Sequence, residues 1–244
     1  MDNKFKDSVW ELLSKSPYRV KAIRPRIILQ NVKQKGIKHY PTFNPNKASD
    51  LEVFVHVSER GAGVLGHVDI CYQGTVYSYG NYDATTERRW GVLGEGVLMK
   101  VSRETYIDFC HNYMKKTLFV YGFDLSPEQH KALRKTLAEN DQTLVPWHPD
   151  DTYPLGHQLD PFSIVMHQDT DVEMFKFTDP RYQAYHAFKK NCVFWVNDVL
   201  VSIGLDMRNG KTYMLPGQYQ WAMDDEYNRG SNLVTKKTIY QPKI

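Results

Sequence analysis

The dipeptide Asn191-Cys192, at the start of an amphipathic segment over residues 192–203, constrains this chain more than any other feature. Its apolar spacing predicts a helix that ends at Gly204. A helix N-terminus carries about half a positive elementary charge, which favours a thiolate over a thiol. The sequence therefore places a nucleophile on the first turn of a helix.

A second interpretation of Cys192 needs no chemistry. Cys192, Val196, Val199 and Ile203 fall on one helical stripe. A free cysteine on such a stripe is commonly a small buried apolar residue.

Composition limits the classes of function. A chain of 244 residues with 41% hydrophobic content can build a substantial core, and we expect one domain over residues 1–244. Lys and Arg total 31 against 28 Asp and Glu, and this net charge of +3 is too small to indicate nucleic acid as a partner. The three cysteines form neither a disulfide framework nor a zinc-type spacing.

The N-terminal sequence, residues 1–7, is charged and has no apolar stretch of the secretory type. No window approaches the roughly 20 apolar residues of a membrane helix. We therefore expect synthesis in the cytoplasm without a signal peptide, and no stable membrane insertion.

Strand and helix signals predict an α+β core after an N-terminal extension over residues 1–50, in which residues 7–14 have helical spacing. Ser126, Pro127 and Gln129 have the spacing of a capping box, with proline at the first helical position. The predicted strands are 51–57, 97–101, 118–125 and a hairpin over 64–79, and the predicted helices are 103–115 and 126–140.

Residues 141–180 have little periodicity and contain five prolines, several aspartates and three histidines. We predict a long loop or insertion near the site, because long irregular segments in compact domains tend to be functional. The tail beyond Met207 is mostly polar, and we assign no element to it.

His67 is the candidate base for Cys192, because an imidazole can take the thiol proton. If Gln73-Gly74 form a two-residue turn, residue 67 faces residue 80, and Ser78 lies diagonally on the same face. Either Ser78 or Asp69 could orient the imidazole. The plainer interpretation is an ordinary strand histidine, with Asp69 and Ser78 on a solvated sheet face.

Other groups of residues are weaker candidates for a functional site. The loop residues His148, Asp150, Asp151, His157, His167 and Asp169 offer oxygen and imidazole ligands, but no pair has the i, i+4 spacing of a zinc helix. Gly91 to Gly96 lacks the lysine and helix of a phosphate loop. We expect no metal and no cofactor. Four tryptophans could line a groove, although core packing is their commoner use: Trp90, Trp147, Trp195 and Trp221.

Taken in order, several segments resemble the circularly permuted NlpC-type branch of the papain-like superfamily, which includes lecithin retinol acyltransferase-like proteins. The resemblance covers about residues 50–205 and is carried by Gly66-His67 on a strand, the run 76–80, the strand leading into 125–129 with its helix, and Asn191-Cys192. It implies an antiparallel sheet packed against the nucleophile helix, with Cys192 as nucleophile and His67 as general base. The family's third polar residue, often a histidine, falls on Ser78 or Tyr79.

The resemblance implies a cysteine peptidase, amidase or acyltransferase, and cleavage of peptidoglycan stem peptides is the activity we expect. Without an export signal, such an enzyme would be an antibacterial effector that a type VI secretion machine delivers to the target-cell periplasm. An immunity protein and a component of the secretion machine are then the expected partners. The alternatives are a lipid acyltransferase or thioesterase of the same fold, and a non-catalytic interaction module.

Overall fold

The computed structural model describes residues 49–56, 66–86, 92–149, 162–211, 214–231 and 233–241. The chain divides into two units, Met1–Lys38 and His39–Ile244, and every described residue belongs to the second. The expected helical segment 7–14 lies outside the described residues, as does nearly all of the extension over 1–50. One domain over residues 1–244 stays a prediction.

The described residues form an eight-stranded antiparallel sheet with the order β10-β6-β1-β2-β3-β5-β8-β7. A second, two-stranded sheet pairs β4 with β9. The predicted α+β class with a large antiparallel sheet is therefore confirmed. The strands are β1 Leu51–His56, β2 His67–Tyr72, β3 Thr75–Gly80, β4 Leu93–Glu95, β5 Val97–Ser102, β6 Leu118–Phe123, β7 Leu144–Pro146, β8 Glu173–Phe177, β9 Ala184–His186 and β10 Lys236–Tyr240.

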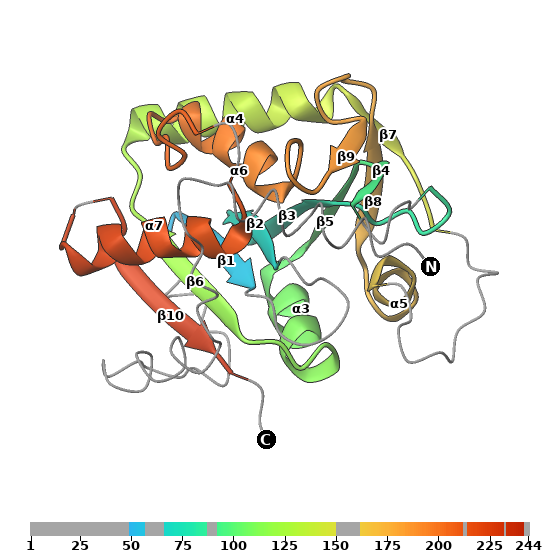
Figure 1. Cartoon of the computed structure of the whole chain (residues 1–244), viewed down its shortest axis with the longest axis horizontal. Coiled ribbons are helices and arrows are strands. Elements are labelled where there is room, and N and C mark those ends of the chain that lie inside the picture. Colours follow the sequence, from blue (N-terminus) through green and yellow to red (C-terminus); the bar gives the residue numbers. More distant parts are fainter. Residues whose placement is uncertain are drawn as a thin grey trace, which may run out of the picture. The chain divides into compact units, whose positions relative to one another are not determined.

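Helices lie on both sides of the large sheet, with α4, α6 and α7 on one side and α3 and α5 on the other (Figure 1). The helix that begins at Cys192 packs against β2 and β3, and both α4 and α7 contact it. The helices are α3 Arg103–Asp108, the π-helix η2 Phe109–Tyr113, α4 Pro127–Asp141, α5 Phe162–Asp169, α6 Cys192–Val201 and α7 Pro216–Asn228.

The turn between β2 and β3 fixes the register that the sequence predicts. Gln73 and Gly74 have φ angles of 52° and 81°, the pair of positive values that a type I′ turn requires. Tyr72 then pairs with Thr75. The predicted two-residue turn is confirmed.

Two segments differ from the sequence-based expectation. The described parts of 141–180 contain β7, α5 and β8, and both strands belong to the large sheet, so an irregular loop is wrong for those residues. The tail beyond Met207 contains α7 and the edge strand β10. Residues 150–161 lie outside the described part, and whether 141–180 is an insertion stays a prediction.

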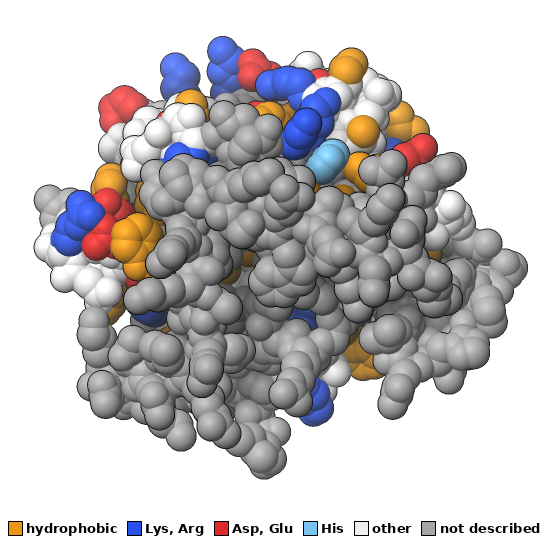
Figure 2. Space-filling view, in the orientation of Figure 1, with side chains coloured by type: hydrophobic (Ala, Val, Ile, Leu, Met, Phe, Trp, Pro, Cys, Tyr) orange, Lys and Arg blue, Asp and Glu red, His pale blue; other side chains and the backbone are white. Residues whose placement is uncertain are grey.

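Within the described ranges, no helix combines the length and apolar character needed to cross a membrane. On the face drawn in Figure 2, Lys and Arg side chains stand among Asp and Glu side chains at the described surface. This mixture of signs agrees with the nearly balanced composition of the chain.

Candidate active site

The start of α6 is held by an asparagine with three hydrogen bonds. Asn191 Oδ1 accepts from the Phe194 N–H at 3.0 Å, which makes Asn191 the N-cap. Its Nδ2 donates to the carbonyls of Ala187 at 2.8 Å and Met214 at 3.1 Å. Asn191 thus fixes the first turn of α6 and the position of Cys192, whose exposed fraction is 1%.

The structure brings Cys192 and His67 together although 124 intervening residues separate them in the sequence. Burial alone would lower the pKa of His67. The negative charges of Asp69 and of a Cys192 thiolate, together with hydrogen bonds to both side chains, instead raise this pKa to about 10. With Asp69 and a Cys192 thiolate beside it, His67 keeps its proton at neutral pH, so the two side chains can form a thiolate–imidazolium ion pair.

Asp69 supplies the nearest carboxylate. It stands two residues after His67 on β2, and its Oδ1 lies 2.8 Å from His67 Nε2. Burial would raise the pKa of Asp69, but the neighbouring His67 and His56 hold it well below its usual range. The carboxylate is fully buried and charged, so the solvated-face interpretation of Asp69 is wrong.

Ser78 is also at the imidazole. Its Oγ lies 3.0 Å from His67 Nε2, and its side chain is fully buried. The diagonal placement across the hairpin that the sequence predicts therefore holds, and the solvated-face interpretation is wrong for Ser78 too. The structure places both candidate orienting groups at the same ring nitrogen.

Tyr82 is a third neighbour of that nitrogen, and no pattern in the sequence indicates it. Its hydroxyl lies 2.8 Å from His67 Nε2 and 2.7 Å from Ser78 Oγ. The segment expected to be a loop holds Tyr82 in place: Phe162 of α5 stacks on its ring, and Ser163 Oγ donates to its carbonyl at 2.5 Å. With Nε2 surrounded, Nδ1 is the ring nitrogen left to take a thiol proton.

Tyr185 of β9 lies beside the sulfur. Its hydroxyl hydrogen-bonds the Cys192 side chain and accepts from the Cys192 backbone N–H. Burial and the charge of a Cys192 thiolate raise the pKa of Tyr185 well above its usual value, so the hydroxyl stays protonated. A backbone N–H and a phenol O–H at one sulfur are suitable donors for an oxyanion.

Tyr79 and Trp195, which the sequence suggested as site residues, make contacts elsewhere. Tyr79, the alternative to Ser78, donates its hydroxyl to the Tyr182 carbonyl at 2.9 Å. Trp195 is fully buried, with its ring centroid 6.4 Å from that of Tyr79. Trp195 is therefore a core residue and lines no open groove.

The candidate metal ligands are only partly described. His148 Nδ1 and His167 Nε2 lie 3.2 Å apart, whereas Asp150, Asp151 and His157 are outside the described residues. Over the ranges that the structure describes, no group of three or more His, Cys, Asp and Glu side chains is arranged to hold a metal ion.

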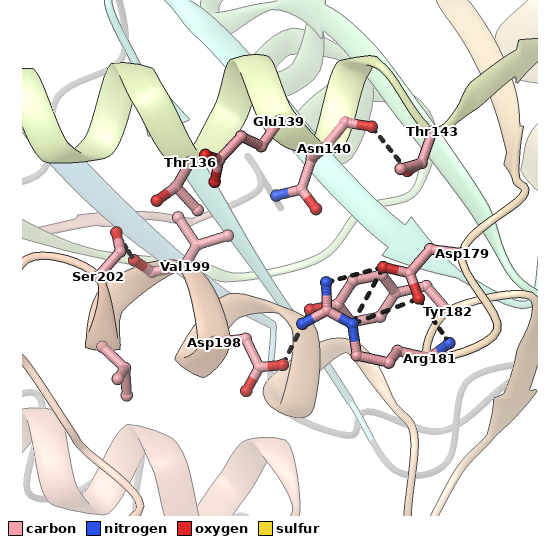
Figure 3. A pocket seen from close by; sticks show the side chains of 11 residues that line it. Thr136, Glu139, Asn140, Thr143, Asp179, Arg181, Tyr182, Asp198, Val199 and Ser202 are labelled. Atoms are coloured by element: carbon pink, nitrogen blue, oxygen red, sulfur yellow. Dashed lines mark hydrogen bonds and ion pairs between the residues drawn. The ribbon is translucent and has the colours of Figure 1, made fainter.

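A pocket of about 390 Å³ lies between α4 and the second half of α6 (Figure 3). Arg181 on its wall pairs with Asp179, and Tyr182 donates to Asp198 at 2.8 Å. Neither Cys192 nor His67 lines it, so the pocket is separate from the thiol. Its lining residues are Thr136, Glu139, Asn140, Thr143, Asp179, Arg181, Tyr182, Asp198, Val199, Val201 and Ser202.

Comparisons of this chain with protein-family models, with curated proteins and with solved structures found no match. The residues around Cys192 are therefore the structural observations that indicate a function.

Proposed function

We propose that this protein is a cysteine hydrolase with a papain-like fold of the permuted NlpC type, in which Cys192 is the nucleophile and His67 the general base. One observation carries the proposal: the thiol at the N-terminus of α6 contacts an imidazole whose Nε2 lies 2.8 Å from a buried carboxylate, Asp69. A thiol, a base and a group that orients the base are the minimum set for nucleophilic catalysis by cysteine.

Before the reaction, the Cys192 thiol passes its proton to His67, which forms the ion pair. In the first half of the reaction, the thiolate attacks the carbonyl carbon of an amide. The negative oxygen that forms replaces the Tyr185 oxygen as the acceptor of the Cys192 N–H, and the Tyr185 hydroxyl donates to it. The C–N bond then breaks, and the leaving amine takes the proton from His67. An acyl group remains on the sulfur.

In the second half, His67 takes a proton from water, and the hydroxide attacks the thioester carbon. The C–S bond breaks, the carboxylic acid leaves, and the Cys192 thiolate is restored beside the His67 imidazolium. The buried Asp69 carboxylate stabilises the imidazolium in both halves without itself becoming protonated.

The substrate we propose is an amide bond in a peptidoglycan stem peptide, in the setting of an antibacterial effector with an immunity protein as partner. Resemblance to NlpC-type enzymes supports this choice, and fold alone does not determine substrate. A lipid acyltransferase or thioesterase would use the same thiol and base.

The deciding experiment is digestion of purified peptidoglycan by the wild-type chain and by Cys192→Ala, with products identified by mass spectrometry. Defined muropeptides released only by the wild type would support a wall amidase or endopeptidase and locate the bond. If nothing is released while Cys192 is still alkylated rapidly at neutral pH, the wall substrate is wrong, and acyl transfer from lipids is the next assay.

A further inference from the structure

A second histidine lies behind His67, and the proposed reaction does not use it. His56, the last residue of β1, is the cross-strand partner of His67, with ring centroids 6.2 Å apart. Asp69 serves both rings: its Oδ1 lies 2.8 Å from His67 Nε2, and its Oδ2 lies 3.6 Å from His56 Nε2. One buried carboxylate is therefore shared by two imidazoles.

The protons of this cluster can be assigned. Tyr106 of α3 donates its hydroxyl proton to Asp69 Oδ2, so the Tyr106 oxygen is free to accept. His56 Nε2 lies 3.0 Å from that oxygen. Burial lowers the pKa of His56 more than Asp69 raises it, and His56 is therefore neutral at pH 7 with a single ring proton.

That proton belongs on Nε2. Across the described residues, His56 Nδ1 is buried with no hydrogen-bond partner, and a proton there would leave a buried donor unsatisfied. With the proton on Nε2, a continuous series of hydrogen bonds and ion pairs runs from His56 through Tyr106, Asp69 and His67 to Cys192.

We propose that His56 and Tyr106 are positioning residues, which hold the Asp69 carboxylate with Oδ1 toward His67 and thereby stabilise a Cys192–His67 ion pair. The inference rests on the proposed function, because it gives a role to residues that act on the Cys192 thiol only through Asp69 and His67. Its physical basis is that a carboxylate with one oxygen held by a phenol donor has only one orientation left for the other oxygen.

The groups around this carboxylate allow a test by pH. Burial raises the pKa values of Tyr82, Tyr106 and Cys110, so these side chains keep their protons at neutral pH. The titratable or charged groups that face the cluster from β1, α3, η2, α6, β9 and the segments after β3 and η2 are His56, Tyr106, Cys110, Cys192, Tyr185, Tyr82 and Lys116.

The experiment measures the rate at which iodoacetamide alkylates Cys192 from pH 6 to 9, with the adduct located by peptide mass spectrometry. If the ion pair forms in the wild type, the alkylation rate is expected to be nearly level across neutral pH. Tyr106→Phe is expected to slow alkylation at pH 7 about fivefold to tenfold and to add a rise near pH 8.5, the behaviour of an unpaired thiol.

Two His56 variants and one double variant distinguish a positioning role from a role in folding alone. His56→Leu removes the donor to Tyr106 and should slow alkylation as Tyr106→Phe does. His56→Gln keeps a neutral amide donor and should restore most of the rate. In an Asp69→Asn background, Tyr106→Phe should have no further effect, because the residue acts through Asp69.

Tyr121→Phe is the matched control, since it removes another buried tyrosine's hydrogen bond to an aspartate, Tyr121 to Asp224 at 2.7 Å, and should leave alkylation unchanged. An unchanged or faster rate in folded Tyr106→Phe overturns the inference and leaves the proposed function standing. A wild-type thiol that reacts only above pH 8 overturns the proposed function itself.

Discussion

At the scale of single residues, Asp69 and Ser78 both lie at His67 Nε2, and they differ in how strongly each favours the protonated imidazole. Asp69 lies at 2.8 Å with a full negative charge, whereas Ser78 lies at 3.0 Å with a neutral hydroxyl. An opposite charge within about 4 Å shifts a histidine pKa by roughly 1–3 units, far more than one neutral hydrogen bond. Asp69 is therefore the group that keeps His67 charged.

Substitution of Asp69 should therefore reduce the reactivity of Cys192 more than substitution of Ser78. Asp69→Asn should lower the alkylation rate of Cys192 at pH 7 by about tenfold or more, because the imidazolium loses its counter-ion. Ser78→Ala should lower it less than about threefold. Time courses of alkylation, quenched at intervals, give the rates for both variants. An equal loss of rate in the two would assign the orienting role to Ser78 as much as to Asp69.

A Tyr185 variant can separate stabilisation of the oxyanion from activation of the Cys192 thiol. If its hydroxyl holds the oxyanion, Tyr185→Phe should lower kcat on an amide substrate about 10²-fold, because the donor acts on a charge that exists only in the transition state. Alkylation passes through no oxyanion, so its rate should change far less than kcat, by the effect of one lost hydrogen bond to the sulfur. Tyr79→Phe, which removes a neighbouring hydroxyl bonded to the Tyr182 carbonyl, is the control and should retain most of kcat.

Candidate site residues could be predicted from the sequence only where they lie on one helix or on one hairpin. Cys192 was visible from its place at a helix start, and Ser78 and Asp69 from the register of one hairpin with His67. Residues that reach the site from other elements carried no local signal, because their hydroxyl or ring arrives through tertiary packing. These are His56, Tyr82, Tyr106 and Tyr185.

At the scale of elements, the same division separates helices from strands. The α4 capping box is local, and the structure has both of its hydrogen bonds: Gln129 N–H to Ser126 Oγ at 3.2 Å and Ser126 N–H to Gln129 Oε1 at 3.0 Å. The strand β10 pairs with β6, which lies more than 100 residues earlier. Apolar and polar residues alternate too weakly in β10 to predict a strand. Pairing across such distances cannot be read from a short window.

The start of α6 gives the element-scale prediction. Asn191→Ala removes the cap and leaves the carbonyls of Ala187 and Met214 without their donor, so it should lower the free energy of unfolding by about 2–4 kcal/mol. Urea unfolding measures the change. Ser126→Ala, which removes only an exposed cap of α4, should cost about 1 kcal/mol, and equal losses would show that the two buried bonds of Asn191 contribute nothing.

At the scale of the whole molecule, the buried ion pair makes stability depend on pH. The folded pKa of His67 is raised to about 10, above an unfolded value of roughly 6.5. A raised histidine pKa contributes stability that is fully present below about pH 6.5 and is lost as pH rises toward the folded pKa. The loss is at most about 1.4 kcal/mol per pH unit, the value for one proton.

The measurement is best made in Cys192→Ala, which removes the thiol's own titration and leaves Asp69 as the opposing charge. Denaturant unfolding at pH 6, 7, 8 and 9 should show stability falling with pH in this variant. Adding His67→Gln should remove the part of the slope that His67 contributes, since an amide does not titrate. Parallel slopes in the two proteins would mean that His67 has the same pKa folded and unfolded, and that Asp69 does not hold it as an imidazolium.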